Sequence, residues 1–152
     1  MKLLKSALLA GASITAFAAS AQDVGFSDGF VKIGVLTDMS GTFVDLGGKA
    51  SVSAAQMAID DFKSTSKPVF QIELVSADHQ NKPDVASAKV RQWIDVDKVD
   101  MVTDVLNSAI ALAAVKVATE KKKIVLNTGS GSMRPTNEDC SPYSVAWVYD
   151  SY

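Results

Sequence analysis

The chain has 152 residues, a formal net charge of −2 and 47% hydrophobic residues. Such a length suits one compact domain rather than two. Nucleic acids and anionic membrane surfaces are excluded as expected partners, because binding them requires a basic patch that this slightly acidic chain lacks.

The first residues predict a secretory signal peptide over residues 1–21. Lys2 and Lys5 precede an apolar run at 7–18 that is short for a membrane span, and the segment ends in the small-x-small sequence Ala-Ser-Ala. Residues 22–152 are therefore expected to form the exported protein, beginning with a loose polar stretch at 22–29.

Apolar periodicity then predicts strands that alternate with helices. The expected strands are 31–37, 69–75, 99–105, 124–126 and 143–149, and the expected helices are 46–64, 81–94 and 108–121. This order predicts an α/β fold with a doubly wound parallel sheet.

The first helix is expected to carry one apolar face, whose small alanines allow close approach to the sheet. Its residues are Ala50, Ala54, Ala58 and Phe62 at four-residue steps, with Ala55 and Ile59 beside them. The second strand is expected near a sheet edge, because polar residues alternate with its apolar ones. Asn81 is a candidate cap for the second helix. The lysines at 121–123 are expected to be solvated charges at a helix end.

Residues capable of catalysis are few. His79 is the sole histidine, and the spacing places no carboxylate to orient it, so a turn-stabilising role is favoured over that of a general base. Cys140 is the sole cysteine, either a small buried or unremarkable residue or half of a disulfide whose partner lies outside the chain. No cluster has metal-ligand spacing, and the Gly129-x-Gly131 pattern lacks the strand and helix context of a nucleotide site.

Short polar residues instead follow the predicted strands, at Ser40, Asn107, Ser108, Ser130 and Ser132. The carboxyl ends of parallel strands form the usual ligand site of an open α/β sheet. A helix that begins at residues 107–108 would favour an anionic group such as a carboxylate. These residues indicate a site that binds a small zwitterion without chemistry.

Several segments in fixed order carry a family resemblance. Residues 32–41, with the sequence KIGVLTDMSG, are followed by Leu46-Gly47, the alanine-rich helix ending in Asp-Asp-Phe, SADHQNK at 76–82, the turn at 104–109 and LNTGS at 126–130. Together they resemble the type I periplasmic solute-binding proteins of ABC transporters, of which the leucine, isoleucine and valine receptors are the best known branch.

The resemblance implies a two-lobed, non-enzymatic receptor that takes no cofactor, closes around a small-molecule ligand in the periplasm and delivers it to a membrane permease. Residues 22–152 would be a partial first lobe, truncated before the second lobe, and would bind ligand weakly or not at all alone. The ligand-binding residues expected from the strand ends and the resemblance are Ser40, Leu46, Asn107, Ser108, Ala109, Gly129, Ser130 and Gly131.

Three residues of the expected ligand site differ from those of the leucine-type receptors, which bears on the identity of the ligand. Leu46 stands where those receptors carry an aromatic residue, Asn107 where they offer a hydroxyl, and Gly131 where they have threonine. An amino acid or a related small carboxylate or amide is therefore expected. The alternatives are an extracytoplasmic ligand-sensing domain and a secreted α/β hydrolase that uses His79.

Overall fold

The computed structural model describes residues 29–151, so the predicted signal peptide and nearly all of the polar stretch after it lie outside the described residues. The strands are β1 (Phe30–Thr37), β2 (Gln71–Asp78), β3 (Met101–Asp104), β4 (Ile124–Asn127) and β5 (Ser144–Ala146). The helices are α1 (Gly48–Ser66), α2 (Pro83–Asp95) and α3 (Ser108–Lys121), with a 3₁₀ turn, η1 (Arg134–Thr136). None of these helices is both long and apolar enough to cross a membrane.

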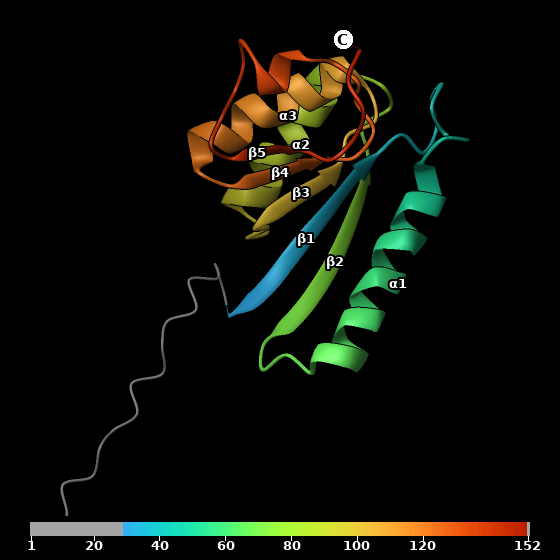
Figure 1. Cartoon of the computed structure of the whole chain (residues 1–152), viewed down its shortest axis with the longest axis vertical. Coiled ribbons are helices and arrows are strands. Elements are labelled where there is room, and N and C mark those ends of the chain that lie inside the picture. Colours follow the sequence, from blue (N-terminus) through green and yellow to red (C-terminus); the bar gives the residue numbers. More distant parts are fainter. Residues whose placement is uncertain (1–28, 152) are drawn as a thin grey trace, which may run out of the picture.

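The five strands form one parallel sheet in the order β2-β1-β3-β4-β5. Helices α2 and α3 lie on one face of the sheet and α1 lies on the other (Figure 1). The predicted α/β class and parallel sheet are confirmed, as is the edge position of β2.

The predicted start of α2 and the predicted end of the last strand are wrong. Asn81 does not cap α2: the cap position is Lys82, and the backbone N–H of Asn81 donates to Nδ1 of His79 at 3.0 Å. The last strand ends at Ala146 rather than residue 149, because parallel pairing to β4 stops where β4 itself ends at Asn127.

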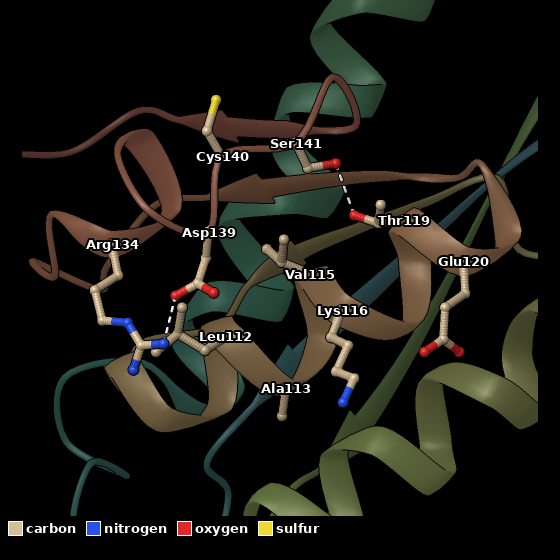
Figure 2. A pocket seen from close by; sticks show the side chains of 10 residues that line it. All are labelled: Leu112, Ala113, Val115, Lys116, Thr119, Glu120, Arg134, Asp139, Cys140 and Ser141. Atoms are coloured by element: carbon tan, nitrogen blue, oxygen red, sulfur yellow. Dashed lines mark hydrogen bonds and ion pairs between the residues drawn. The ribbon is translucent and has the colours of Figure 1, made fainter.

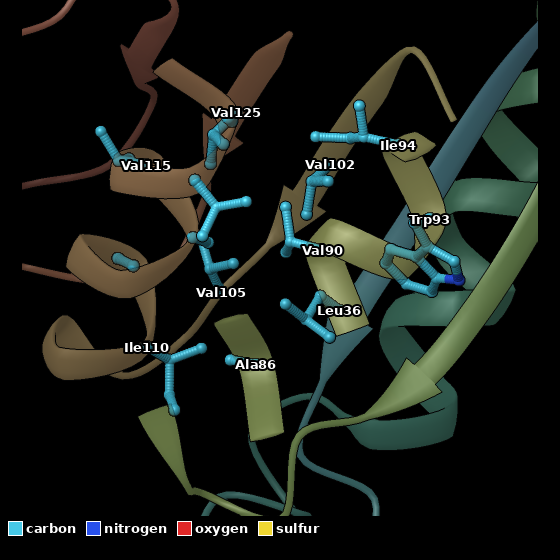
Figure 3. Packing of buried hydrophobic residues seen from close by; sticks show 14 of the residues in the cluster. Leu36, Ala86, Val90, Trp93, Ile94, Val102, Val105, Ile110, Val115 and Val125 are labelled. Atoms are coloured by element: carbon cyan, nitrogen blue, oxygen red, sulfur yellow. The ribbon is translucent and has the colours of Figure 1, made fainter. Parts of the chain in front are cut away.

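One face of the sheet, here called the closed face, is sealed by α2 and α3. Its core contains Leu36 from β1, Val102 from β3 and Val125 from β4, all fully buried. Figure 3 shows these side chains packed against the helices. The predicted stripe of α2 is confirmed, since all four of its residues are buried: Ala86, Val90, Trp93 and Ile94.

The opposite face, here called the open face, is only partly covered, because α1 packs mainly over β1 and β2. The predicted apolar face of α1 is therefore confirmed only in part: Ile59 is buried and Ala55 half-buried, but Ala50, Ala54 and Ala58 are exposed, so the expected close packing of these alanines is wrong. An apolar groove of about 360 Å³ remains beside the helix. It is lined by Ile33, Ala55, Ala58, Ile59, Phe62, Ile72, Met101, Thr103 and Leu126.

The amino ends of three strands are tied together by Asp100. Its backbone N–H donates to the carbonyl of Lys32 at 2.9 Å, and its carboxylate accepts from the Lys32 N–H at 3.1 Å and pairs with Lys123 at 2.7 Å. Lys121 pairs with Asp95 at 2.8 Å. The prediction of purely solvated lysines at this helix end is therefore wrong for two of the three.

Candidate functional site

The first four strands in sequence end in an aspartate or asparagine at their carboxyl ends. These residues are Asp38, which follows β1 directly, Asp78, Asp104 and Asn127. Three of these side chains, Asp38, Asp78 and Asn127, accept hydrogen bonds from backbone N–H groups two to five positions further along, and so hold the following loop in one conformation. Side-chain hydrogen bonds therefore fix the loops at three of the four strand ends.

Asn127 organises the loop after β4. Its side chain is fully buried, its Oδ1 accepts from the N–H groups of Gly129 at 3.2 Å and Ser130 at 2.8 Å, and its Nδ2 donates to the carbonyl of Ser130 at 2.8 Å. Because the backbone N–H groups of residues 129 and 130 already donate to Asn127, a ligand would contact the side chain of Ser130 or the outer surface of the loop.

The loop after β3 leads into the N-terminus of α3. Asn107 caps the helix, with its Oδ1 accepting from the N–H of Ala109 at 2.8 Å. Ser108 is the first helical residue and is half-buried. The positive end of the helix dipole therefore lies beside a serine hydroxyl at this edge.

The two loops meet through their serines. Oγ of Ser130 donates to Oγ of Ser108 at 3.1 Å, and Ser130 is only 1% exposed. The neighbouring parallel pairing of β3 and β4 produces this meeting, since Asp104 lies opposite Asn127 in the register. The sequence prediction that both loops open at the same edge of one sheet is confirmed.

Leu106 joins a third loop to this pair. A Cβ added to Gly129 or to Gly47, which precedes α1, would collide with the Leu106 side chain. At Gly129 the added Cβ would also lie 3.0 Å from Cα of Leu106, so glycine there lets the loop after β4 approach the backbone of the loop after β3, whereas the atoms nearest to Gly47 all belong to side chains. The sequence analysis did not assign this role to Leu106, although two glycines in separate strand-end loops were a signal of close approach.

The backbone at the end of β3 is in an uncommon conformation. Asp104 has φ = 82° and Val105 has φ = 53°. A β-branched residue in the left-handed region is a steric outlier that costs on the order of 1–3 kcal/mol. Oδ2 of Asp104 is also buried without a hydrogen-bond partner among the described residues. Strain is thus concentrated directly before the helix that carries Ser108.

Two further predicted residues, Ser40 and Leu46, lie in the segment between β1 and α1. Oγ of Ser40 donates to the Asp78 carboxylate at 2.6 Å and so bonds toward β2. Burial alone would raise the pKa of Asp78, but donation from Ser40, Met39 and Gln80 outweighs it and lowers the pKa. Leu46 is 75% exposed above the sheet edge.

His79 lies directly after β2 and is fully buried. Its Nδ1 accepts from Asn81, so the neutral ring carries its proton on Nε2, which has no partner among residues 29–151. Burial lowers the pKa of His79, and the nearby carboxylates of Asp38, Asp78 and Asp104 oppose this only in part. The favoured turn-stabilising role is confirmed. The hydrolase alternative loses its base, because a fully buried ring cannot reach a substrate in solution.

A groove lies elsewhere, on the outer side of α3 (Figure 2). It measures about 630 Å³, with Leu112 and Val115 at its base and the Arg134–Asp139 ion pair at its rim. None of the predicted ligand-binding residues lines it. Cys140, also at this rim, is exposed and is therefore not a small buried residue, while the alternatives of an unremarkable residue and of a disulfide with a partner outside the chain both stay open. In residues 29–151 no group of three acidic, histidine or cysteine side chains could hold a metal ion.

Comparison with known proteins shows which family the chain belongs to. A family model described as periplasmic binding protein matches residues 30–152, and the chain therefore belongs to the periplasmic binding protein family. Comparison with curated protein sequences found no match.

Three solved structures illustrate the similarity. A periplasmic binding protein from Burkholderia mallei is 45% identical, with a TM-score of 0.76 over 80% of this chain and 32% of its own. A branched-chain amino acid ABC transporter periplasmic ligand-binding protein from Burkholderia xenovorans is 40% identical, with a TM-score of 0.74 over 79% of this chain and 32% of its own.

The third is an ABC transporter solute-binding protein from Rhodopseudomonas palustris in complex with 3,4-dihydroxybenzoic acid. It is 25% identical, with a TM-score of 0.60 over 78% of this chain and 31% of its own. The present chain thus spans about a third of the length of the structures it matches.

Proposed function

We propose that the chain contributes the first part of the substrate-binding component of an ABC transporter. It would capture an amino acid or a related small carboxylate or amide in the periplasm, for delivery to a membrane permease. Export through the segment 1–21 and the absence of catalysis belong to the same proposal. Family membership and the two Burkholderia relatives support this assignment.

The single observation that carries the proposal is the contact between Ser130 and Ser108 at the N-terminus of α3. Two hydroxyls and the positive end of a helix converge there, and this set of groups suits a carboxylate. The neighbouring residues of the same two loops, Asn107, Ala109, Gly129 and Gly131, complete the proposed first-lobe side of the ligand site. Ser40 and Leu46 would border it from the loop after β1.

A second lobe would complete the cleft in proteins of the relatives' length, and residues 29–151 would supply one wall of that site. We expect weak binding, with dissociation constants in the millimolar range. The test is titration of the ¹⁵N-labelled chain with leucine, benzoate and acetamide at millimolar concentrations, followed by amide chemical shifts. Shifts confined to residues 107–110 and 128–131 support the proposal.

The matched variants are Ser130→Ala and Ser53→Ala. Loss of the Ser130 hydroxyl should raise the dissociation constant about tenfold, the value of one hydrogen bond to a charged group. Ser53 lies on the exposed side of α1 and bonds only to the carbonyl of Lys49, so its variant should bind like the wild type. Equal binding by both variants, or tight micromolar binding by the chain alone, would contradict the one-wall site.

A further inference from the structure

Gly131 and Tyr149 form a matched pair beside the serine contact. A Cβ added to Gly131 would lie 3.1 Å from Cε2 of Tyr149 and 3.6 Å from Cδ2. The first distance is shorter than ordinary van der Waals contact, so a side chain at position 131 would press on the ring. Gly131 does not have a positive φ, so its backbone conformation does not by itself require glycine. A side chain at position 131 would instead require the Tyr149 ring to move by a few tenths of an ångström.

The segment that carries Tyr149 is held against the site loop by backbone hydrogen bonds. The N–H of Ser151 donates to the carbonyl of Gly131 at 2.9 Å, and the N–H of Trp147 donates to the carbonyl of Asn127 at 2.8 Å. Figure 1 shows the end of the described chain at the end of the sheet where the strand arrows point. The backbone on either side of Tyr149 is therefore held at the carboxyl edge.

The ring of Tyr149 nevertheless remains open to solvent, with 77% of the residue exposed. An aromatic side chain whose backbone is tied down but whose face is uncovered can stack on a ligand at little entropic cost. Gly131 adjoins Ser130, whose hydroxyl reaches Ser108, so the ring lies one residue from the groups proposed to hold a carboxylate.

Resting on the proposed function, we propose that Tyr149 determines the specificity of this site and forms an aromatic wall for ligands that join a planar ring to a carboxylate. Gly131 makes room for that ring. The relative that was solved with 3,4-dihydroxybenzoic acid binds a molecule of this chemistry. The ligand's carboxylate would lie at the Ser108–Ser130 end, and its ring would stack on Tyr149.

The test compares benzoate with leucine by amide shift titration of the ¹⁵N-labelled chain. Tyr149→Ala should raise the dissociation constant for benzoate about tenfold, within the range of aromatic pair energies, and leave that for leucine unchanged. Tyr149→Phe keeps the ring and should bind like the wild type. Trp147→Ala is the matched control, because Trp147 is also 77% exposed and lies two residues away.

Gly131→Thr tests whether glycine at position 131 is what makes room for the Tyr149 ring. Its side chain should displace the ring, so that benzoate affinity falls as in Tyr149→Ala, and it should have no further effect when combined with that variant. Thermal unfolding of each variant controls for folding. Benzoate binding that is insensitive to Tyr149, with shifts still at residues 107–110 and 128–131, overturns this inference and leaves the proposed function standing. Absence of shifts there with every probe overturns both.

Discussion

The two faces of the sheet carry similar apolar residues but differ in how far these residues are buried. On the closed face, Leu36, Val102 and Val125 are fully buried under α2 and α3. On the open face, Ile33, Met101 and Leu126 come from the same strands and are only half-buried beside an apolar groove. Strand alternation decides which face a residue joins, but the number of helices above it decides how much surface is removed from water.

The largest difference between the faces is expected from a matched pair of leucines. Leu36→Ala leaves a cavity on the closed face and should lower the free energy of unfolding by about 2–5 kcal/mol. Leu126→Ala removes a half-buried side chain that leaves no enclosed cavity, so about 1 kcal/mol or less is expected. Urea denaturation followed by circular dichroism measures both. Equal losses would show that the open face is covered in solution.

Replacing a small residue by a larger one gives a second, smaller difference in stability between the two faces. Ala114 on α3 is fully buried, so Ala114→Leu should overpack the closed face and cost about 1–3 kcal/mol. Ala58 lines the groove beside α1, so Ala58→Leu should fill empty space and stabilise by about 0.5 kcal/mol. The same denaturation experiment checks both, and destabilisation by Ala58→Leu would mean that the groove is not empty in solution.

His79 provides a pH probe, because it is as buried as the closed-face core and is the only histidine. Its pKa is lower in the folded chain than the ordinary value of about 6.5. The unfolded chain therefore takes up a proton first as the pH falls below about 6.5, and stability decreases until the pH reaches the folded-state pKa.

The variant His79→Asn keeps a side-chain acceptor for the N–H of Asn81 and removes the titration. Its unfolding free energy should vary less between pH 7.5 and 5 than that of the wild type. The lowered pKa of Asp78 acts only below about pH 3.8, outside this window. Parallel pH profiles for the two proteins would show that His79 is accessible to solvent protons in the folded state.

The smallest effect is expected at the outer rim of the closed face. Arg91 on α2 pairs with Glu120 on α3 at 3.1 Å, and both side chains are nearly half exposed. Water and salt screen such a pair, so Arg91→Ala should cost less than about 0.5 kcal/mol. A double-mutant cycle with Glu120→Ala, measured at low and high salt, checks it. A coupling that survives high salt would place this pair among the buried contacts.

The sequence predicts most of the fold because periodicity and turn residues are local signals. The stripe of α2 and the edge position of β2 follow from that pattern, and the structure confirms both. The exposure of Ala50 and Ala54 could not be predicted, because it depends on how many helices cover that face. Asn81 was assigned as a cap by residue type alone, whereas the buried His79 side chain takes its N–H.

At the candidate site, the polar residues were predictable and their connections were not. Ser108 and Ser130 could be placed after neighbouring strands from their position in sequence alone. The roles of Asn127 and Leu106 depend on three loops that meet in space, and a single sequence does not show such contacts. The position of Tyr149 against Gly131 depends on where the last strand ends, which is the least certain kind of sequence prediction.

The strand order also influences the sequence in which the strands pair during folding. β4 joins β3, and β5 joins β4, after a single connection, whereas β1 meets β3 only after the chain has passed through α1, β2 and α2. The hydrogen bond from Lys32 to Asp100 spans 68 positions, and a loop of that length closes at a large entropic cost. The unit β3–α3–β4 is therefore expected to form early, with the docking of β1 as the slow step of refolding.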